Sequence, residues 1–126
     1  MAAHALDTGE LCHAVAIGYD WCYDYLQQQQ PATRAAIAAG LVSRGVSSFW
    51  GAFKSHDQPF WVSGSGSNWV VVTSSGAGIA ALALMGEPEA PSYLPAFLSS
   101  ALGNVRSALP GFAPDGAWQE GSMYHG

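Results

Sequence analysis

The residues that could do chemistry gather near the C-terminus, in the segment FAPDGAWQEGSMYHG at positions 112–126. It carries an indole, a carboxylate, a phenol and an imidazole, those of Trp118, Glu120, Tyr124 and His125. A phenol can transfer a proton when its pKa, ordinarily about 10, is lowered or matched to the leaving group. An indole offers a flat apolar face to a sugar ring, and a carboxylate can accept a bond from a hydroxyl. Together these groups indicate a carbohydrate site with proton transfer.

A second group lies in the middle of the chain, where Ser67 is expected to cap a helix that begins at Asn68. The Asn68 carboxamide would then stand beside free backbone N–H groups and the positive end of a helix dipole. That combination suits a carboxylate or a developing oxyanion. Trp69 and Trp61 could add aromatic faces. The same residues also fit a structural role, with Asn68 as a helix cap and the tryptophans in the core.

Composition excludes some classes of partner. Charged residues make up 10% of the chain, against about 25% in a typical soluble domain, and the formal net charge is −5. The four Lys and Arg residues form no basic patch, so we expect no nucleic-acid partner. So few charges leave little to solvate a free-standing domain. We therefore expect part of a larger protein, or a chain that self-associates through exposed apolar faces.

Several other features bound the function. Cys12 and Cys22 lie ten residues apart in one predicted helix, or about 15 Å, too far for a disulfide. We expect both to be free and buried, and the compartment stays undecided.

The opening MAAHALDTGE lacks the features of a signal peptide. No apolar run reaches the roughly 18–20 residues of a membrane span. His4 and His13 fit no metal-ligand pattern, and we expect neither a metal nor a cofactor.

Apolar spacing predicts an all-α fold of four helices within a single domain. Asp7 and Glu10 fit a capping box for the first helix. Its apolar residues recur with a period close to 3.6, at Leu11, Val15, Gly18, Cys22 and Leu26.

Pro31 is expected in the first turn of the second helix. That helix carries Ile37, Leu41, Phe49 and Phe53, with Gly40 and Gly45 as close-packing points or a bend. Residues 54–67 are predicted to form a loop. A third helix is expected over about 68–85 and a fourth over about 91–108.

Short connections favour antiparallel neighbours. If the four helices alternate in direction, the starts of the first and third helices lie at the same end of the stack as the ends of the second and fourth. Asn68 would then share this end with the 112–126 segment and Tyr124, although 56 residues separate the two in sequence.

Three motifs in order resemble the heparinase II/III-like polysaccharide lyases. These are IGYDWCYDYL at 17–26, NWVVVTSSGAGIAALAL at 68–84 and FAPDGAWQEGSMYHG at 112–126. The resemblance implies an incomplete (α/α) toroid of antiparallel helical hairpins, which a β-sandwich region follows in the family. It also implies cleavage of an acidic, uronate-containing polysaccharide by β-elimination.

By that resemblance, Asn68 neutralises the uronate carboxylate and Tyr124 acts as the catalytic acid. Trp69, Trp118, Glu120 and His125 would then contact the substrate. Many family members have His or Asn where this chain has Trp69. The rest of the toroid and the β-sandwich lie beyond this chain, so we expect residues 1–126 to be a fragment with little activity alone. Family members are often periplasmic or secreted. The alternatives are a glycoside hydrolase of toroid fold, which would need paired acids, and a non-catalytic helical binding module.

Overall fold

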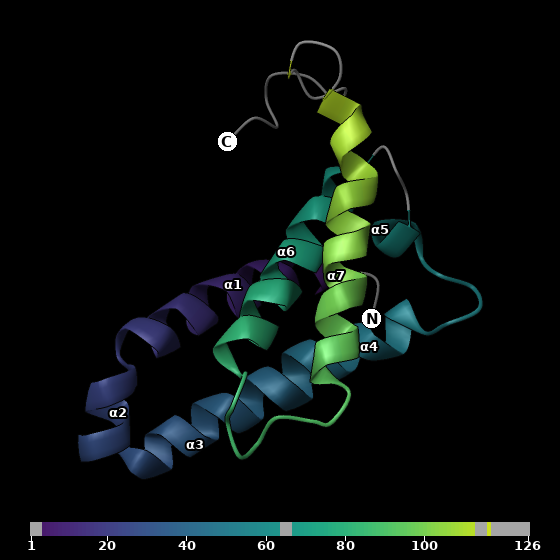
Figure 1. Cartoon of the computed structure of the whole chain (residues 1–126). Coiled ribbons are helices and arrows are strands. Elements are labelled where there is room, and N and C mark those ends of the chain that lie inside the picture. Colours follow the sequence, from purple (N-terminus) through teal and green to yellow (C-terminus); the bar gives the residue numbers. More distant parts are fainter. Residues whose placement is uncertain (1–3, 64–66, 113–115, 117–126) are drawn as a thin grey trace.

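The computed structural model describes residues 4–63, 67–112 and 116, and within these ranges the secondary structure is entirely helical (Figure 1). The all-α prediction is confirmed. The elements, in chain order, are α1 (Ala5–Trp21), α2 (Tyr23–Gln29), α3 (Pro31–Gly40), the π-helical segment η2 (Leu41–Val46), α4 (Ser47–Phe53), α5 (Phe60–Ser63), α6 (Asn68–Ala83), α7 (Leu94–Ala108) and the 3₁₀ segment η3 (Leu109–Phe112).

The first helix differs from the prediction at both ends. α1 begins at Ala5 after His4, so Asp7 lies in the first turn and the expected capping box is wrong. Thr8 Oγ1 instead donates to the His4 carbonyl at 2.7 Å. The helix also breaks at Cys22, and the short α2 begins at the next residue, Tyr23. Pro31 does start α3, because a first-turn position needs no N–H donor.

Most of the apolar residues that recur along the predicted first helix do not lie on its buried face, although Leu26 is buried. Leu11 and Val15 are 63% and 43% exposed, and Gly18 and Cys22 are exposed as well. The residues of α1 that are buried are Ala5, Gly9, Cys12, Ala16 and Tyr19. α1 carries apolar residues on two faces, and the face with the smaller side chains is the one that packs. Both cysteines are free as predicted, but only Cys12 is buried, and burial raises the pKa of its thiol to about 11.

Glycines let α1 and α6 pack in close contact. A Cβ added to Gly76 would overlap the backbone carbonyl of Gly9, and one added to Gly9 would lie 3.0 Å from the Thr73 Cα. Further along both helices, Trp21 of α1 and Ala83 of α6 line one small cavity. The two helices therefore run in the same direction.

The neighbouring helices run the opposite way. A Cβ on Gly45 would lie 2.5 Å from Cys12 Sγ, so the predicted close packing at Gly45 is confirmed, whereas Gly40 faces open space. Gly78 of α6 faces Ala101 of α7. Figure 1 shows α6 and α7 side by side, joined by the loop at residues 84–93. The predicted alternation of direction thus holds for the described helices.

An aromatic cluster fills the space between α4, α5 and α7. The rings of Phe53 and Phe97 stack with centroids 5.2 Å apart, and Phe49 meets Trp61 edge-on at 5.8 Å. Trp50 stacks on Tyr93 at 5.3 Å. Such pairs add about 0.5–1.5 kcal/mol each beyond the burial of apolar area. The 54–67 segment, predicted to be a loop, contains the helical turn α5 because Trp61 and Val62 are buried in this cluster.

Replacing Gly76 tests the packing of α1 on α6. Gly76→Ala places a methyl group where the Gly9 carbonyl lies, so the helices must separate, and we expect a loss of about 2–3 kcal/mol in the free energy of unfolding. Gly103→Ala is the matched control, since Gly103 lies inside α7 and faces open space. There, alanine should stabilise by up to about 1 kcal/mol. Urea denaturation measures both, and equal effects would contradict the close approach.

Candidate functional site

The start of α6 is shaped by a side-chain cap. Ser67 is extended, with φ −112° and ψ 130°, and its Oγ accepts a hydrogen bond from the Trp69 N–H at 3.2 Å. The predicted cap at Ser67 and the helix start at Asn68 are confirmed. Asn68 is the first residue of the helix and is half-buried.

A hydroxyl holds this first turn against α5. Thr73 Oγ1 lies 3.1 Å from the Trp61 carbonyl and 2.7 Å from the Trp69 carbonyl, and its hydrogen can be shared between the two. Trp69 also packs on Phe60, with ring centroids 5.1 Å apart. The backbone around Asn68 is therefore fixed by contacts on two sides.

The electrostatics of this turn favour an anion. No residue of α6 is charged, so no carboxylate lies in its first turn to compete for the N–H groups. The backbone N–H groups and the positive end of the helix dipole both act at this end of α6. A carboxylate is the kind of ligand that such a terminus binds.

The sequence-predicted residues divide into two groups. Asn68 and Trp69 lie together at the start of α6, both half-buried. Tyr124, Trp118, Glu120 and His125 lie outside the described residues. Trp61 is only 4% exposed and packs in the aromatic cluster, so the core interpretation fits its ring better than an open sugar platform.

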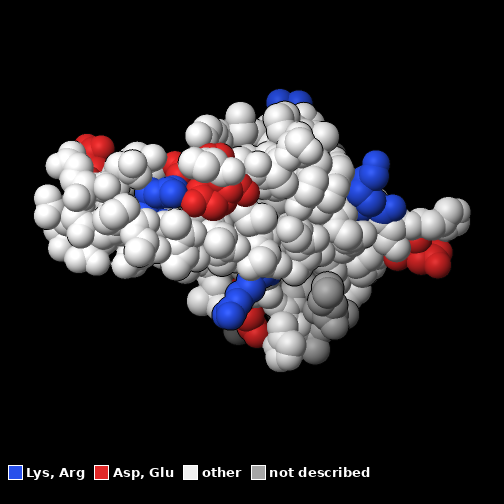
Figure 2. Space-filling model, turned by 90° about the horizontal axis from the view of Figure 1, so that it is seen from below, with Lys and Arg blue, Asp and Glu red and all other residues white. Residues whose placement is uncertain are grey.

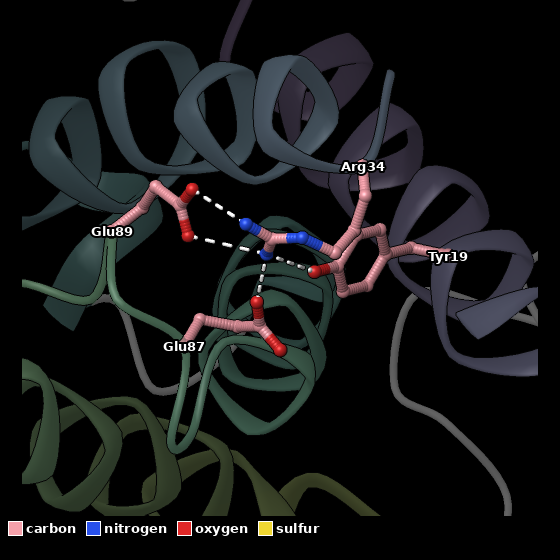
Figure 3. A network of polar contacts seen from close by, with 4 residues as sticks. All are labelled: Tyr19, Arg34, Glu87 and Glu89. Atoms are coloured by element: carbon pink, nitrogen blue, oxygen red, sulfur yellow. Dashed lines mark hydrogen bonds and ion pairs between the residues drawn. The ribbon is translucent and has the colours of Figure 1, made fainter. Parts of the chain in front are cut away.

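The sequence analysis missed a charged cluster around Arg34 (Figure 3). The Arg34 guanidinium makes a two-point contact with Glu89, at 2.8 Å and 3.2 Å, and also pairs with Glu87. Its Nη1 donates to the Tyr19 hydroxyl at 3.2 Å. This Arg34 cluster joins α3 and α1 to the loop that precedes α7.

The cluster shifts the pKa of several groups. Hydrogen bonding to Glu89 raises the pKa of Arg34, and the same bond lowers the pKa of Glu89. Burial raises the pKa of Tyr19, and hydrogen bonding to Glu87 raises that of Tyr23. The guanidinium therefore stays charged and both phenols stay protonated at neutral pH. The arrangement is that of a structural ion pair, not of a proton-transfer site.

Helical spacing could have signalled the cluster. Arg34 lies on the buried stripe that continues through Ala38, Leu41 and Gly45, at intervals of three or four residues. An arginine on the buried stripe of a helix needs an acidic side chain that is buried beside it. The sequence offers Glu87 and Glu89 in GEPEAP, between the third and fourth predicted helices.

Among residues 4–63, 67–112 and 116, no three His, Cys, Asp or Glu side chains gather as metal ligands would. No helix in those same ranges combines the length and apolar character needed to cross a membrane.

Comparison of the chain with known protein families, with curated proteins and with solved structures finds no match. The resemblance to the heparinase II/III-like lyases therefore rests on the three motifs alone.

Replacing Arg34 tests whether the cluster stabilises the packing of one helical hairpin on the other. Arg34→Met leaves Glu87 and Glu89 without their cation, and we expect a loss of about 3 kcal/mol or more in unfolding free energy. Arg44→Met is the control, because Arg44 is exposed and has no ion pair among the described residues. That change should stay within about 0.5 kcal/mol. Similar values for the two variants would show that the cluster adds little.

Stability should also fall in acid because of Glu89. Its pKa is lower in the folded chain than its ordinary 4.5, so its contribution is complete above that value and is lost as pH falls through the folded pKa. Glu89→Gln should flatten the decline of unfolding free energy below pH 4.5, whereas Asp24→Asn, at an exposed residue of α2, should not. Denaturant curves across this range measure the slopes, and an unchanged slope for Glu89→Gln would contradict the assignment.

Proposed function

We propose that this chain is the part of a polysaccharide lyase that binds and activates a uronate unit for β-elimination. In this proposal Asn68 and the first turn of α6 neutralise the uronate carboxylate, which makes the C5 proton more acidic. Tyr124 then supplies the acid, and in the same position can serve as the base. Trp69, Trp118, Glu120 and His125 contact the sugar.

The observation that carries the proposal is the character of the α6 start. It is a capped helix terminus, α6 itself carries no acidic residue, and Asn68 is its first residue. The alternation of helix directions adds a second support. Because α6 and α7 are antiparallel, the chain leaves α7 at the end where α6 begins (Figure 1). The segment with Tyr124 follows α7 and η3 in the sequence.

The arrangement of helices fits the same proposal at a coarser level. α1 and the segment from α3 to α4 form one antiparallel hairpin, and α6 and α7 form a second. The two hairpins stack through α1 and α6. We propose that they form part of an incomplete (α/α) toroid, with further catalytic groups supplied from outside residues 1–126. Self-association through the exposed Leu11, Val15 and Trp21 stays a prediction.

The test begins at the gene, whose reading frame is followed past the codon for Gly126 so that the complete protein can be produced. With alginate or heparan sulfate as substrate, we expect an unsaturated uronate product, detected by its ultraviolet absorbance. Tyr124→Phe should lower kcat by about 10²–10⁴-fold, because proton transfer is lost. Asn68→Ala should lower it by about 10²–10³-fold, because a stabilising donor is lost.

Tyr25→Phe is the control, since Tyr25 is an exposed tyrosine on α2 and its loss should leave the rate unchanged. Cleavage without an unsaturated product, with Asp115 or Glu120 essential, would favour the hydrolase. Activity that survives both Asn68→Ala and Tyr124→Phe would contradict the lyase proposal.

A further inference from the structure

A cavity of about 480 Å³ opens between α4 and the segment that leads into α5, and we call it the α4–α5 cavity. Its size is that of a small-molecule site, since such sites span about 300–1,000 Å³. Polar groups lie around it, those of Ser47, Ser48, Ser55 and Asp57. Ser47 Oγ already pairs with the Tyr93 hydroxyl at 2.9 Å and Ser55 Oγ donates to the Asp57 carbonyl at 3.4 Å, and each of these oxygens can still accept from a ligand hydroxyl.

Trp61 forms part of the cavity wall and is 4% exposed. Its Nε1–H is buried and has no hydrogen-bond partner among the described residues. A buried donor without an acceptor costs about 1–3 kcal/mol. A ligand hydroxyl that accepts from this N–H would remove that cost.

Gly51 provides an open part of the wall on α4. A Cβ added at Gly51 would meet no atom within 4 Å, so the backbone there is bare and accessible. A flat ring could lie against this stretch of helix. Glycine inside a helix costs about 0.5–1 kcal/mol relative to alanine, so Gly51 leaves α4 less stable than an alanine would.

The charge of the cavity favours a neutral ligand. Asp57 is its one charged lining residue, and its side chain is fully exposed beside His56. The nearest basic residue in sequence, Lys54, does not line the cavity, and its ammonium lies over the Trp50 ring at 5.3 Å. Figure 2 shows one face of the molecule, on which uncharged surface separates most charged side chains and one basic group lies directly against a cluster of acidic ones. A carboxylate-bearing ligand would meet Asp57 without a lining cation to offset it.

We propose that the α4–α5 cavity binds a neutral sugar unit of an oligosaccharide. The serine hydroxyls and Asp57 pair with sugar hydroxyls, and Trp61, whose ring stays in the core, supplies an N–H donor. This goes beyond the proposed lyase function, because it concerns an uncharged ligand and a separate set of residues. Binding here does not depend on Asn68 or Tyr124.

The experiment follows the indole N–H signals of the isotope-labelled chain by NMR. The chain has five tryptophans, and Trp61→Phe identifies the Trp61 signal. Cellotetraose, xylotetraose and mannotetraose are the neutral probes, and tetragalacturonate is their acidic counterpart. We expect a saturable shift of the Trp61 signal with a neutral tetrasaccharide, and none with the acidic one.

Gly51→Leu should fill the cavity and weaken binding at least about tenfold, a difference of roughly 1.4 kcal/mol. Gly103→Leu is the matched control at another open helical glycine and should bind as the parent chain does. Asp57→Asn, at an exposed residue, provides a second variant whose fold should be intact. It should weaken neutral binding, because a sugar hydroxyl loses its carboxylate acceptor, and it should permit binding of tetragalacturonate.

Three results would overturn the proposal. One is the absence of any Trp61 shift with all three neutral tetrasaccharides. Another is an unchanged shift in a folded Gly51→Leu chain, checked by circular dichroism. The third is equal affinity of the unsubstituted chain for tetragalacturonate. None of these results depends on β-elimination. A failure of the lyase assay can therefore be distinguished from a failure of the cavity to bind a neutral sugar.

Discussion

The packing of α1 against α6 is the constraint on which the other helices depend. At Gly9 and Gly76 the two backbones touch, because neither residue carries a Cβ. Close approach brings many atoms into contact along both helices, and dispersion between them is individually small but collectively large. The parallel direction of these two helices then fixes where α3 and α7 can pack. The start of α6, with Asn68, takes its place from this one interface.

The Arg34 cluster restricts how the packed helices can be oriented relative to one another. Apolar contacts are tolerant of small rotations, whereas a guanidinium that meets two carboxylates and a phenol has few acceptable positions. The cluster draws the loop before α7 onto α3, and α7 follows from there. Its charges are mostly buried and paired, so they act on the arrangement of helices more than on any ligand.

Two regions carry polar groups of the kind that bind ligands, and their chemistry differs. The start of α6 presents backbone N–H groups with no acidic residue in the helix, and it suits an anion. The α4–α5 cavity presents hydroxyls and a carboxylate, and it suits a neutral polyhydroxy ligand. Both border α5, whose backbone is tied to α6 through Thr73. A chain that handles a polysaccharide with charged and uncharged units would need both kinds of site.

The sequence by itself determined the helical class, the start of α3 at Pro31 and the capped start of α6 at Ser67. These are local matters, because proline geometry and a serine cap act within a single turn. It also predicted the alternation of helix directions, since short connections leave little choice.

Only the tertiary structure decided which face of α1 is buried. Both faces of α1 are apolar. The face with Gly9 is buried instead of the face with Leu11, because small residues allow α6 to come close. Likewise, the partners of Arg34 lie 53 and 55 residues away, and no local pattern selects them. The same holds for the α4–α5 cavity, which Trp61 and Gly51 line together only after the chain has folded back on itself.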